Sequence, residues 1–215
     1  MIIFANGELN HAAAVLDTLR PGDVLIAADG GARQCLELNL IPDTVIGDFD
    51  SLTEKEQAAL KAAGSKLIRH PRDKDETDLE LALRIAGWLK PDDVLVFGAL
   101  GARWDMTVSN LLLLTHPDFA FTSISLLDGP QEISLLRGGQ SLSLQGQSGD
   151  TLSLIPLHGD AHGISTHGLK YPLTDETLRF GATRGVSNVF LAEQSSVKLN
   201  DGLLLCVVIH RTGDW

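Results

Sequence analysis

The spacing of apolar residues changes near the middle of the chain. Before about residue 128, short apolar runs alternate with stretches in which apolar residues recur every three or four positions, a pattern that predicts strands alternating with helices. The predicted strands are Ile2–Ala5, Val24–Ala28, Thr44–Ile46, Lys66–Arg69, Val94–Phe97 and Phe121–Leu127. The clearest helix extends from about Glu76 to Leu89, and another begins near Asp105 and ends before Pro117. Because parallel strands need crossover connections, this half is predicted to be a doubly wound α/β domain with a mostly parallel sheet.

From about Glu132 onward, polar and apolar residues alternate one by one. The segments with this period of two are Ser141–Gln145, Thr151–Ile155 and Ser196–Asn200. Turns rich in Gly, Ser and Asp separate them, which indicates antiparallel strands with one buried face. The last run, Leu203–Ile209, is apolar on both faces and is predicted to lie buried between layers. We therefore predict an α/β domain over residues 1–128 and an antiparallel β-sandwich over residues 132–215.

The composition and charge of the chain exclude some classes of binding partner. The chain has 215 residues and a net charge of −11, which argues against nonspecific nucleic-acid binding and against an anionic membrane surface. Its only cysteines, Cys35 and Cys206, stand in apolar surroundings and show no metal-ligand spacing, so both are predicted to be core residues. The first residues lack a basic segment, and no apolar run reaches the roughly 18 residues of a membrane span. These features predict a cytoplasmic protein.

Aspartates follow the predicted strands of the first half. They are Asp29 in Ala-Asp-Gly-Gly, Asp48 and Asp50 in Gly-Asp-Phe-Asp-Ser, Asp75 and Asp78 in Lys-Asp-Glu-Thr-Asp, and Asp105 in Gly-Ala-Arg-Trp-Asp. All four segments can lie at the carboxyl edge of one parallel sheet, where open α/β folds bind ligands. Mg²⁺ is commonly held by one or two carboxylates together with phosphates, so the pattern predicts a site for Mg²⁺ and a phosphate-containing substrate.

Helix capping is the alternative role for several of these acids. Asp48 and Asp50 are two positions apart, so in an extended segment their carboxylates point the same way and can chelate one metal ion. Asp75 and Asp78 are also suited to be the N-cap and the third residue of the following helix. Asp105 is likewise suited to be an N-cap of the next helix.

Cations and glycine turns accompany the aspartates. Lys74 and Arg103 are predicted phosphate contacts, with solvated surface cations as the alternative. Asn6-Gly7 and Asp29-Gly30-Gly31 end the first two strands and are predicted to be loops on the nucleotide side, because glycine lets backbone N–H groups approach an anion.

Six segments together resemble the thiamine pyrophosphokinase family. They are Ala28-Asp-Gly-Gly, Pro42-Asp with Gly47-Asp-Phe-Asp-Ser-Leu, Lys74-Asp-Glu-Thr-Asp-Leu-Glu, Gly101-Ala-Arg-Trp-Asp, Gly168-Leu-Lys-Tyr-Pro-Leu and Gly185-Val-Ser-Asn. The resemblance runs from the first strand to about residue 190. It implies transfer of a pyrophosphoryl group from ATP to the hydroxyethyl oxygen of thiamine, giving thiamine diphosphate and AMP. It also implies a homodimer with shared active sites.

The resemblance assigns roles to residues. The metal and catalytic set would be Asp48, Asp50, Asp78 and Asp105, and Asp78 or Asp105 would be the general base if one acts. In the β-sandwich, Tyr171 would stack on the thiamine pyrimidine, and Ser187 with Asn188 would hydrogen-bond its amino-pyrimidine edge. Family members commonly carry His after the last aspartate and a second glycine before it; this chain has Met106 and Ala102.

Two other functions remain open at this point. A pyrophosphokinase for another alcohol, such as a hydroxymethylpterin, would keep the aspartates but change the β-sandwich contacts, and the segments around Tyr171 and Ser187 argue against it. A nucleotide-binding or Mg²⁺-sensing module without catalysis is the other alternative.

Overall fold

The structure is a computed structural model that describes residues 1–10, 12–101 and 103–211. It divides into two compact units, the first ending at Gly129 and the second beginning at Pro130. Among the residues described, no helix has both the length and the apolar composition needed to cross a membrane.

A parallel sheet forms the centre of the first unit. Its strands are β1 (Ile2–Phe4), β2 (Leu25–Ala28), β3 (Thr44–Gly47), β4 (Lys66–Arg69), β5 (Asp93–Phe97) and β6 (Ser123–Asp128). They lie in the order β6-β5-β1-β2-β3-β4, and every pair is parallel. The chain moves outward from β1 to β4 and then returns to β5 on the other side of β1, so the order reverses between β1 and β5. This reversal is the topological switch point at which such sheets bind ligands.

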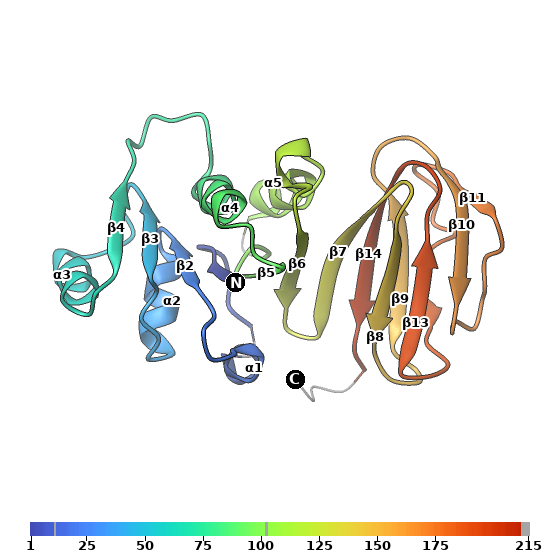
Figure 1. The fold of residues 1–215 in the computed structure, drawn as a ribbon, viewed down its shortest axis with the longest axis horizontal. Coiled ribbons are helices and arrows are strands. Elements are labelled where there is room, and N and C mark those ends of the chain that lie inside the picture. The colour runs from blue at the N-terminus through green and yellow to red at the C-terminus, as the bar shows by residue number, and fades with distance from the viewer. Residues whose placement is uncertain (11, 102, 212–215) are drawn as a thin grey trace. The chain divides into compact units, whose positions relative to one another are not determined.

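Helices cover both faces of this sheet. They are α1 (Ala12–Thr18), α2 (Gly31–Glu37), α3 (Glu54–Ala62), α4 (Asp78–Leu89), α5 (Trp104–Leu113) and the 3₁₀ turn η1 (Pro117–Phe119). α1 and α2 lie on one side, and α4 and α5 lie on the other (Figure 1). Phe4 and Phe97 stack in the core with their ring centroids 5.8 Å apart. The predicted doubly wound α/β fold is confirmed.

Neither α4 nor α5 is capped by an aspartate, in contrast to the capping alternatives. α4 begins at Asp78, two residues later than predicted, and its N-cap is Thr77, whose hydroxyl accepts the Glu80 N–H at 3.2 Å. The capping alternative for Asp75 and Asp78 is therefore wrong. Thr77 takes the role because its backbone is extended and its short hydroxyl reaches the third residue of the helix. The capping alternative for Asp105 is also wrong, since Asp105 lies inside the first turn of α5.

Two antiparallel sheets form the second unit. Its strands are β7 (Gln131–Arg137), β8 (Ser141–Gln145), β9 (Thr151–Pro156), β10 (Ala161–His167), β11 (Glu176–Leu178), β12 (Asn188–Val189), β13 (Gln194–Lys198) and β14 (Leu203–Ile209). β7, β14, β9 and β12 pair in that order, and β8, β13, β10 and β11 pair in that order. Side chains from both sheets share one core, including Leu152, Cys206, Ile164 and Val197. The predicted β-sandwich is confirmed.

Strand β14 is central in its sheet, with β7 on one side and β9 on the other. Leu204 and Cys206 on this strand are fully buried, as its apolar sequence predicts, whereas Ile209 at its end is 36% exposed. Cys35 and Cys206 are both free and buried, and burial raises the pKa of each thiol to about 12.

Candidate active site

Three carboxylates meet at the carboxyl edge of the parallel sheet. Asp29 follows β2, and Asp48 and Asp50 follow β3; each offers an oxygen, and these oxygens all lie within 4.8 Å of one another. We call these three residues the acidic cluster. Asp78 adjoins it from the start of α4: a Cβ placed on Gly47 would lie 3.0 Å from the Asp29 Cβ and 3.2 Å from Asp78 Oδ1. Parallel strands bring their carboxyl ends to one edge, which is why residues far apart in the sequence converge here.

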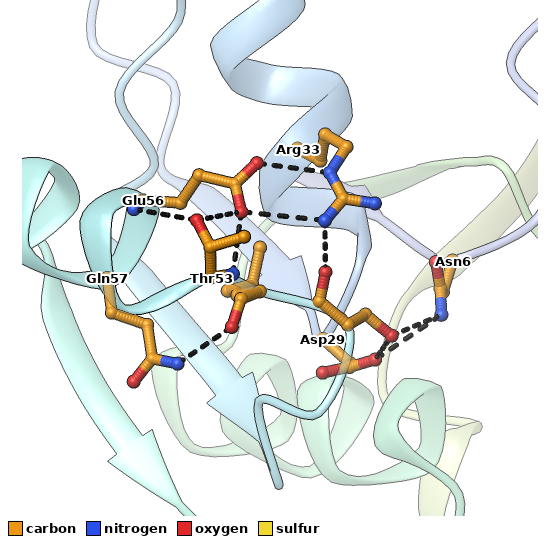
Figure 2. Close-up of polar contacts among 8 residues, drawn as sticks. Asn6, Asp29, Arg33, Thr53, Glu56 and Gln57 are labelled. Atoms are coloured by element: carbon orange, nitrogen blue, oxygen red, sulfur yellow. Dashed lines mark hydrogen bonds and ion pairs between the residues drawn. The ribbon is translucent and has the colours of Figure 1, made fainter.

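Asp29 is the most buried member of the acidic cluster, with 4% of its surface exposed. Its Oδ2 accepts hydrogen bonds from the Ser51 hydroxyl and from Asn6 Nδ2, the latter at 3.3 Å (Figure 2). Its other oxygen, Oδ1, is buried and has no hydrogen-bond partner among the residues the structure describes. An unpaired buried carboxylate oxygen is costly unless a cation or donor completes it. The acidic cluster therefore fits a hard divalent cation such as Mg²⁺.

The sequence placed Asp29 with the other aspartates at the carboxyl edge of the sheet but assigned it to the nucleotide, outside the predicted metal set. The signal for a metal role of Asp29 is its position directly after β2, a strand that neighbours β3. Only the strand order shows that β2 and β3 are adjacent. Asp105, by contrast, was predicted to be a metal ligand. It follows β5, on the far side of β1, and is not a member of the acidic cluster.

Lys74 contacts the acidic site through Asp78. Its Nζ lies 3.1 Å from Asp78 Oδ1, close enough for an ion pair although the two atoms are not aligned as a hydrogen bond. Burial raises the pKa of the Asp78 carboxyl, Lys74 opposes that rise, and the carboxylates of Asp29 and Asp48 add to it. Asp78 is thus a carboxylate whose basicity its surroundings increase. Asp75, by contrast, is exposed.

Three arginines near the acidic cluster were not singled out from the sequence. Arg33 donates to the Ser51 carbonyl and pairs with Glu56 at 3.1 Å, as Figure 2 shows for the pair. Arg69 donates to the Asp48 carbonyl at 2.6 Å, and Arg72 lies 3.8 Å from Asp50 Oδ2. Arg33 and Arg69 therefore both hold the loop after β3, which carries Asp48 and Asp50. Arginine has no local pattern that marks such a role, so the sequence offered no signal.

A pocket opens beside the acidic cluster at the switch point between β1 and β5. It encloses about 210 Å³. Its walls are Ala5, Asn6, Gly7, Ala28, Thr77, Asp78, Leu79, Gly98, Ala99, Gly101, Arg103, Met106 and Asn110. Three predicted site residues, Asn6, Asp78 and Arg103, therefore share one cavity. Met106, the departure from the family pattern, also lines it, whereas Ala102 lies outside the described residues.

Arg103 and Asp105 form an ion pair with each other at the start of α5. Both side chains are largely exposed, at 69% and 65%, and the hydrogen bond from Arg103 lowers the pKa of Asp105. The pair places a guanidinium at the pocket wall. A pair this exposed contributes little to stability, which leaves Arg103 available to an anionic ligand.

The glycines after Asp29 are needed for close packing. A Cβ on Gly31 would lie 2.1 Å from the Phe4 carbonyl oxygen, and one on Gly30 would lie 1.9 Å from Asn6 Oδ1. Glycine at these positions lets the start of α2 pack directly on the end of β1. The same approach holds Asn6 against Asp29, so the turn also shapes the acidic cluster.

The predicted thiamine residues lie together in the second unit. Asn188 is buried, and its amide grips the backbone of Tyr171: Oδ1 accepts the Tyr171 N–H at 3.0 Å and Nδ2 donates to the Tyr171 carbonyl at 2.7 Å. The Tyr171 side chain is 58% exposed, and Lys170 Nζ lies 5.5 Å from its ring centroid. Ser187 is exposed and has a left-handed backbone conformation, with φ of 62°. The side chain of Asn188 therefore positions Tyr171 by holding the Tyr171 backbone.

Comparison with known proteins identifies the family. A family model described as "Thiamin pyrophosphokinase, catalytic domain" matches residues 16–126, and one described as "Thiamin pyrophosphokinase, vitamin B1 binding domain" matches residues 140–204. The chain belongs to the thiamin pyrophosphokinase family. Enzymes of this family transfer pyrophosphate from ATP to thiamine and release thiamine diphosphate and AMP.

Relatives within the thiamin pyrophosphokinase family match most of the chain. "Thiamine pyrophosphokinase" of Bacillus subtilis (strain 168) is 31% identical over 182 residues, covering 85% of this chain and 85% of its own length. "Thiamine pyrophosphokinase 1" of Arabidopsis thaliana is 30% identical over 213 residues, covering 87% of this chain and 79% of its own. The crystal structure of thiamine pyrophosphokinase from Bacillus subtilis superposes with a TM-score of 0.87 at 28% identity, covering 98% of this chain and 99% of that one.

Proposed function

We propose that this chain carries out the family's reaction with Mg²⁺ held at the acidic cluster and ATP bound at the switch point. The observation that carries the proposal is that three carboxylates converge beside a pocket, and that the buried Oδ1 of Asp29 among them has no hydrogen-bond partner in the described part of the chain. Asp29, Asp48 and Asp50 would hold the metal, with Asp78 adjoining. Bound Mg²⁺ would supply charge neutralisation for the phosphates of ATP. The predicted metal role of Asp105 stays a prediction.

The residues of this chain have distinct tasks in that proposal. Arg103, and Lys74 through its pairing with Asp78, would place positive charge where the phosphates lie, since phosphoryl transfer depends mainly on positioning and charge stabilisation. Asn6 and Gly30 would shape the nucleotide side of the pocket. Asp78 would accept the proton of the attacking hydroxyl, because a carboxylate whose pKa burial raises is a better base than an exposed one.

Thiamine would contact the second unit. The vitamin B1 binding match spans Tyr171, Ser187 and Asn188. Tyr171 would present its exposed ring for stacking on the pyrimidine, and Ser187 would offer a hydroxyl to the amino-pyrimidine edge. Asn188, predicted to do the same, uses its amide oxygen and one N–H on Tyr171, so its larger contribution would be to hold Tyr171 in place.

Replacing the exposed ring should separate the two substrates. Tyr171→Ala should weaken thiamine binding by about 1–3 kcal/mol, the scale of a lost aromatic stack on a base, and leave ATP affinity unchanged. Calorimetry with each substrate measures both effects. Phe180→Ala is the matched control, since Phe180 is an aromatic residue of the same unit with 60% of its surface exposed. Equal loss of both ligands in Tyr171→Ala would mean that Tyr171 supports the fold.

We further propose a homodimer whose active sites are shared between subunits, in the cytoplasm. Exposed apolar side chains of the second unit support association: Tyr171, Val186 and Leu191 are each at least 43% exposed. A twofold dimer would let one subunit's acidic cluster act with the other's thiamine residues.

Mixing two inactive variants tests the shared site. Asp48→Asn and Tyr171→Ala chains, each nearly inactive alone at subsaturating thiamine, should regain activity when their subunits exchange, because each heterodimer holds one intact site. The control mixes each variant with itself under the same treatment. If exchange is demonstrated by mass and activity does not return, each site lies within one chain.

Chromatography of the nucleotide product tests the reaction itself. AMP formed from ATP only when thiamine is present supports the proposal. AMP formed with a hydroxymethylpterin or another alcohol but not with thiamine would indicate a different acceptor, and ATP bound without consumption would indicate a binding module.

A further inference from the structure

Asn110 lines the switch-point pocket and carries a buried hydrogen-bond acceptor that is unpaired among the described residues. It lies on α5, is 5% exposed, and is one of the residues that line the cavity. Its Nδ2 donates to the Ala99 carbonyl at 2.7 Å. Its Oδ1 is buried and has no hydrogen-bond partner within the described part of the chain.

The hydrogen bond to Ala99 fixes which way the amide points. Only the amide nitrogen can donate to a carbonyl, and exchanging the two amide atoms would set two acceptors against each other. Oδ1 is therefore the atom left without a partner. A buried acceptor that stays unpaired is destabilising, so a ligand that offers a donor at this point binds more tightly than one that does not.

The chemistry of the acceptor indicates which part of ATP it meets. Phosphate oxygens carry no proton to donate at neutral pH, and an amide oxygen repels them, so the phosphates belong nearer to Arg103, Lys74 and the acidic cluster. The nucleoside part offers neutral donors, namely the two ribose hydroxyls and the adenine amino group. Several residues that line the pocket are small and leave room for a flat or compact group, among them Ala5, Gly98 and Ala99.

We propose that Asn110 Oδ1 accepts a hydrogen bond from a neutral donor on the nucleoside of ATP and thereby makes Asn110 a specificity-determining residue. This inference rests on the proposed binding of ATP at the switch point. Discrimination of this kind is strong because the wrong ligand leaves a buried polar atom unpaired.

Calorimetry without thiamine tests the inference, with excess Mg²⁺ throughout. The ligands are ATP, which has all three donors, and three analogues that each lack one. 2′-Deoxy-ATP lacks the 2′-hydroxyl, 3′-deoxy-ATP lacks the 3′-hydroxyl, and ITP lacks the amino group. The wild-type protein should bind one analogue at least about tenfold more weakly than ATP, and that analogue identifies the donor. Asn110→Ala should bind ATP about tenfold more weakly and should no longer distinguish that analogue from ATP.

Two controls protect the result against a general loss of folding. Ser109→Ala changes the neighbouring exposed position of α5 and should keep the wild-type preference. The ratio of two affinities within one variant does not depend on how much protein is folded. If Asn110→Ala does not fold, Asn110→Ser replaces it, since its shorter hydroxyl no longer reaches the same position and should reduce the same ratio.

Several outcomes would overturn the inference. Equal binding of all four nucleotides by the wild-type protein would show that no nucleoside donor is read. An analogue preference that persists in the Asn110 variant would assign it to another residue. Unchanged ATP binding by Asn110→Ala, together with weakened thiamine binding in a separate thiamine titration of the same variant, would assign Asn110 to the other substrate. Normal AMP formation alongside any of these leaves the proposed function standing, whereas failure to bind ATP at all overturns the proposed function first.

Discussion

Asp48→Asn should lower the rate of thiamine diphosphate formation about a hundredfold or more while leaving the fold intact. The substitution removes one anionic ligand from the acidic cluster, and loss of a single catalytic electrostatic group commonly has an effect of this size. The local turn should survive, because Asp48 Oδ1 accepts the Asp50 N–H at 2.9 Å and the amide oxygen of asparagine can accept the same bond. Steady-state kinetics at limiting Mg²⁺ measure the loss, and thermal unfolding measures the fold.

The matched control for Asp48→Asn is Asp17→Asn, which removes the same charge from an exposed position on α1. It should have wild-type kinetics. Normal turnover of Asp48→Asn at limiting Mg²⁺ would show that the acidic cluster is not the metal site and that its carboxylates only shape the loops.

Gly31→Ala should destabilise the protein by about 3 kcal/mol or more, which is at the upper end for added volume in a packed position. The new Cβ would lie 2.1 Å from the Phe4 carbonyl oxygen and 2.6 Å from its carbon, and both atoms belong to the backbone of β1. No side-chain rotation can relieve this contact, so α2 must move away from the sheet. The same movement would shift Asp29, and activity should fall with stability.

Gly87→Ala is the control for Gly31→Ala, because it adds the same methyl group to a helix. There the nearest atom is a Phe121 ring carbon at 3.4 Å, an ordinary contact, so the better helix propensity of alanine should preserve or raise stability by up to about 1 kcal/mol. Urea denaturation of both variants gives the comparison. Unfolding of Gly31→Ala at the wild-type urea concentration would contradict the packing role of this glycine.

Helix and strand positions were largely predictable, since they depend on local periodicity. Lys66–Arg69 and Ser141–Gln145 form strands with the predicted bounds, and Leu79 and Ala86 lie on the buried face of α4. Helix starts were less predictable because capping depends on single hydroxyl groups: Thr77 caps α4, although Asp75 has the residue type that capping favours.

The sequence predicted that aspartates gather at the carboxyl edge of the sheet, but not which of them meet. Aspartates at strand ends indicated a divalent metal and phosphate, and Asp48 and Asp50 meet as their spacing suggests. Asp29 joins them because β2 lies next to β3, while Asp105 lies apart because β5 is on the far side of β1. Crossover rules set the handedness of connections but leave strand order open, so the sequence alone could not show which aspartates converge.

By itself, the sequence determined the two fold classes, the family and the position of aspartates at strand ends, because each of these depends on periodicity or on short motifs. Only the tertiary structure decided that Gly31 packs on β1, that Asn188 holds Tyr171, and that Asn110 lines the pocket with an oxygen unpaired among the described residues. Each of these is a relation between atoms distant in sequence. Hydrogen-bond satisfaction and close packing depend on which neighbours the fold supplies, and residue spacing along the chain carries no record of them.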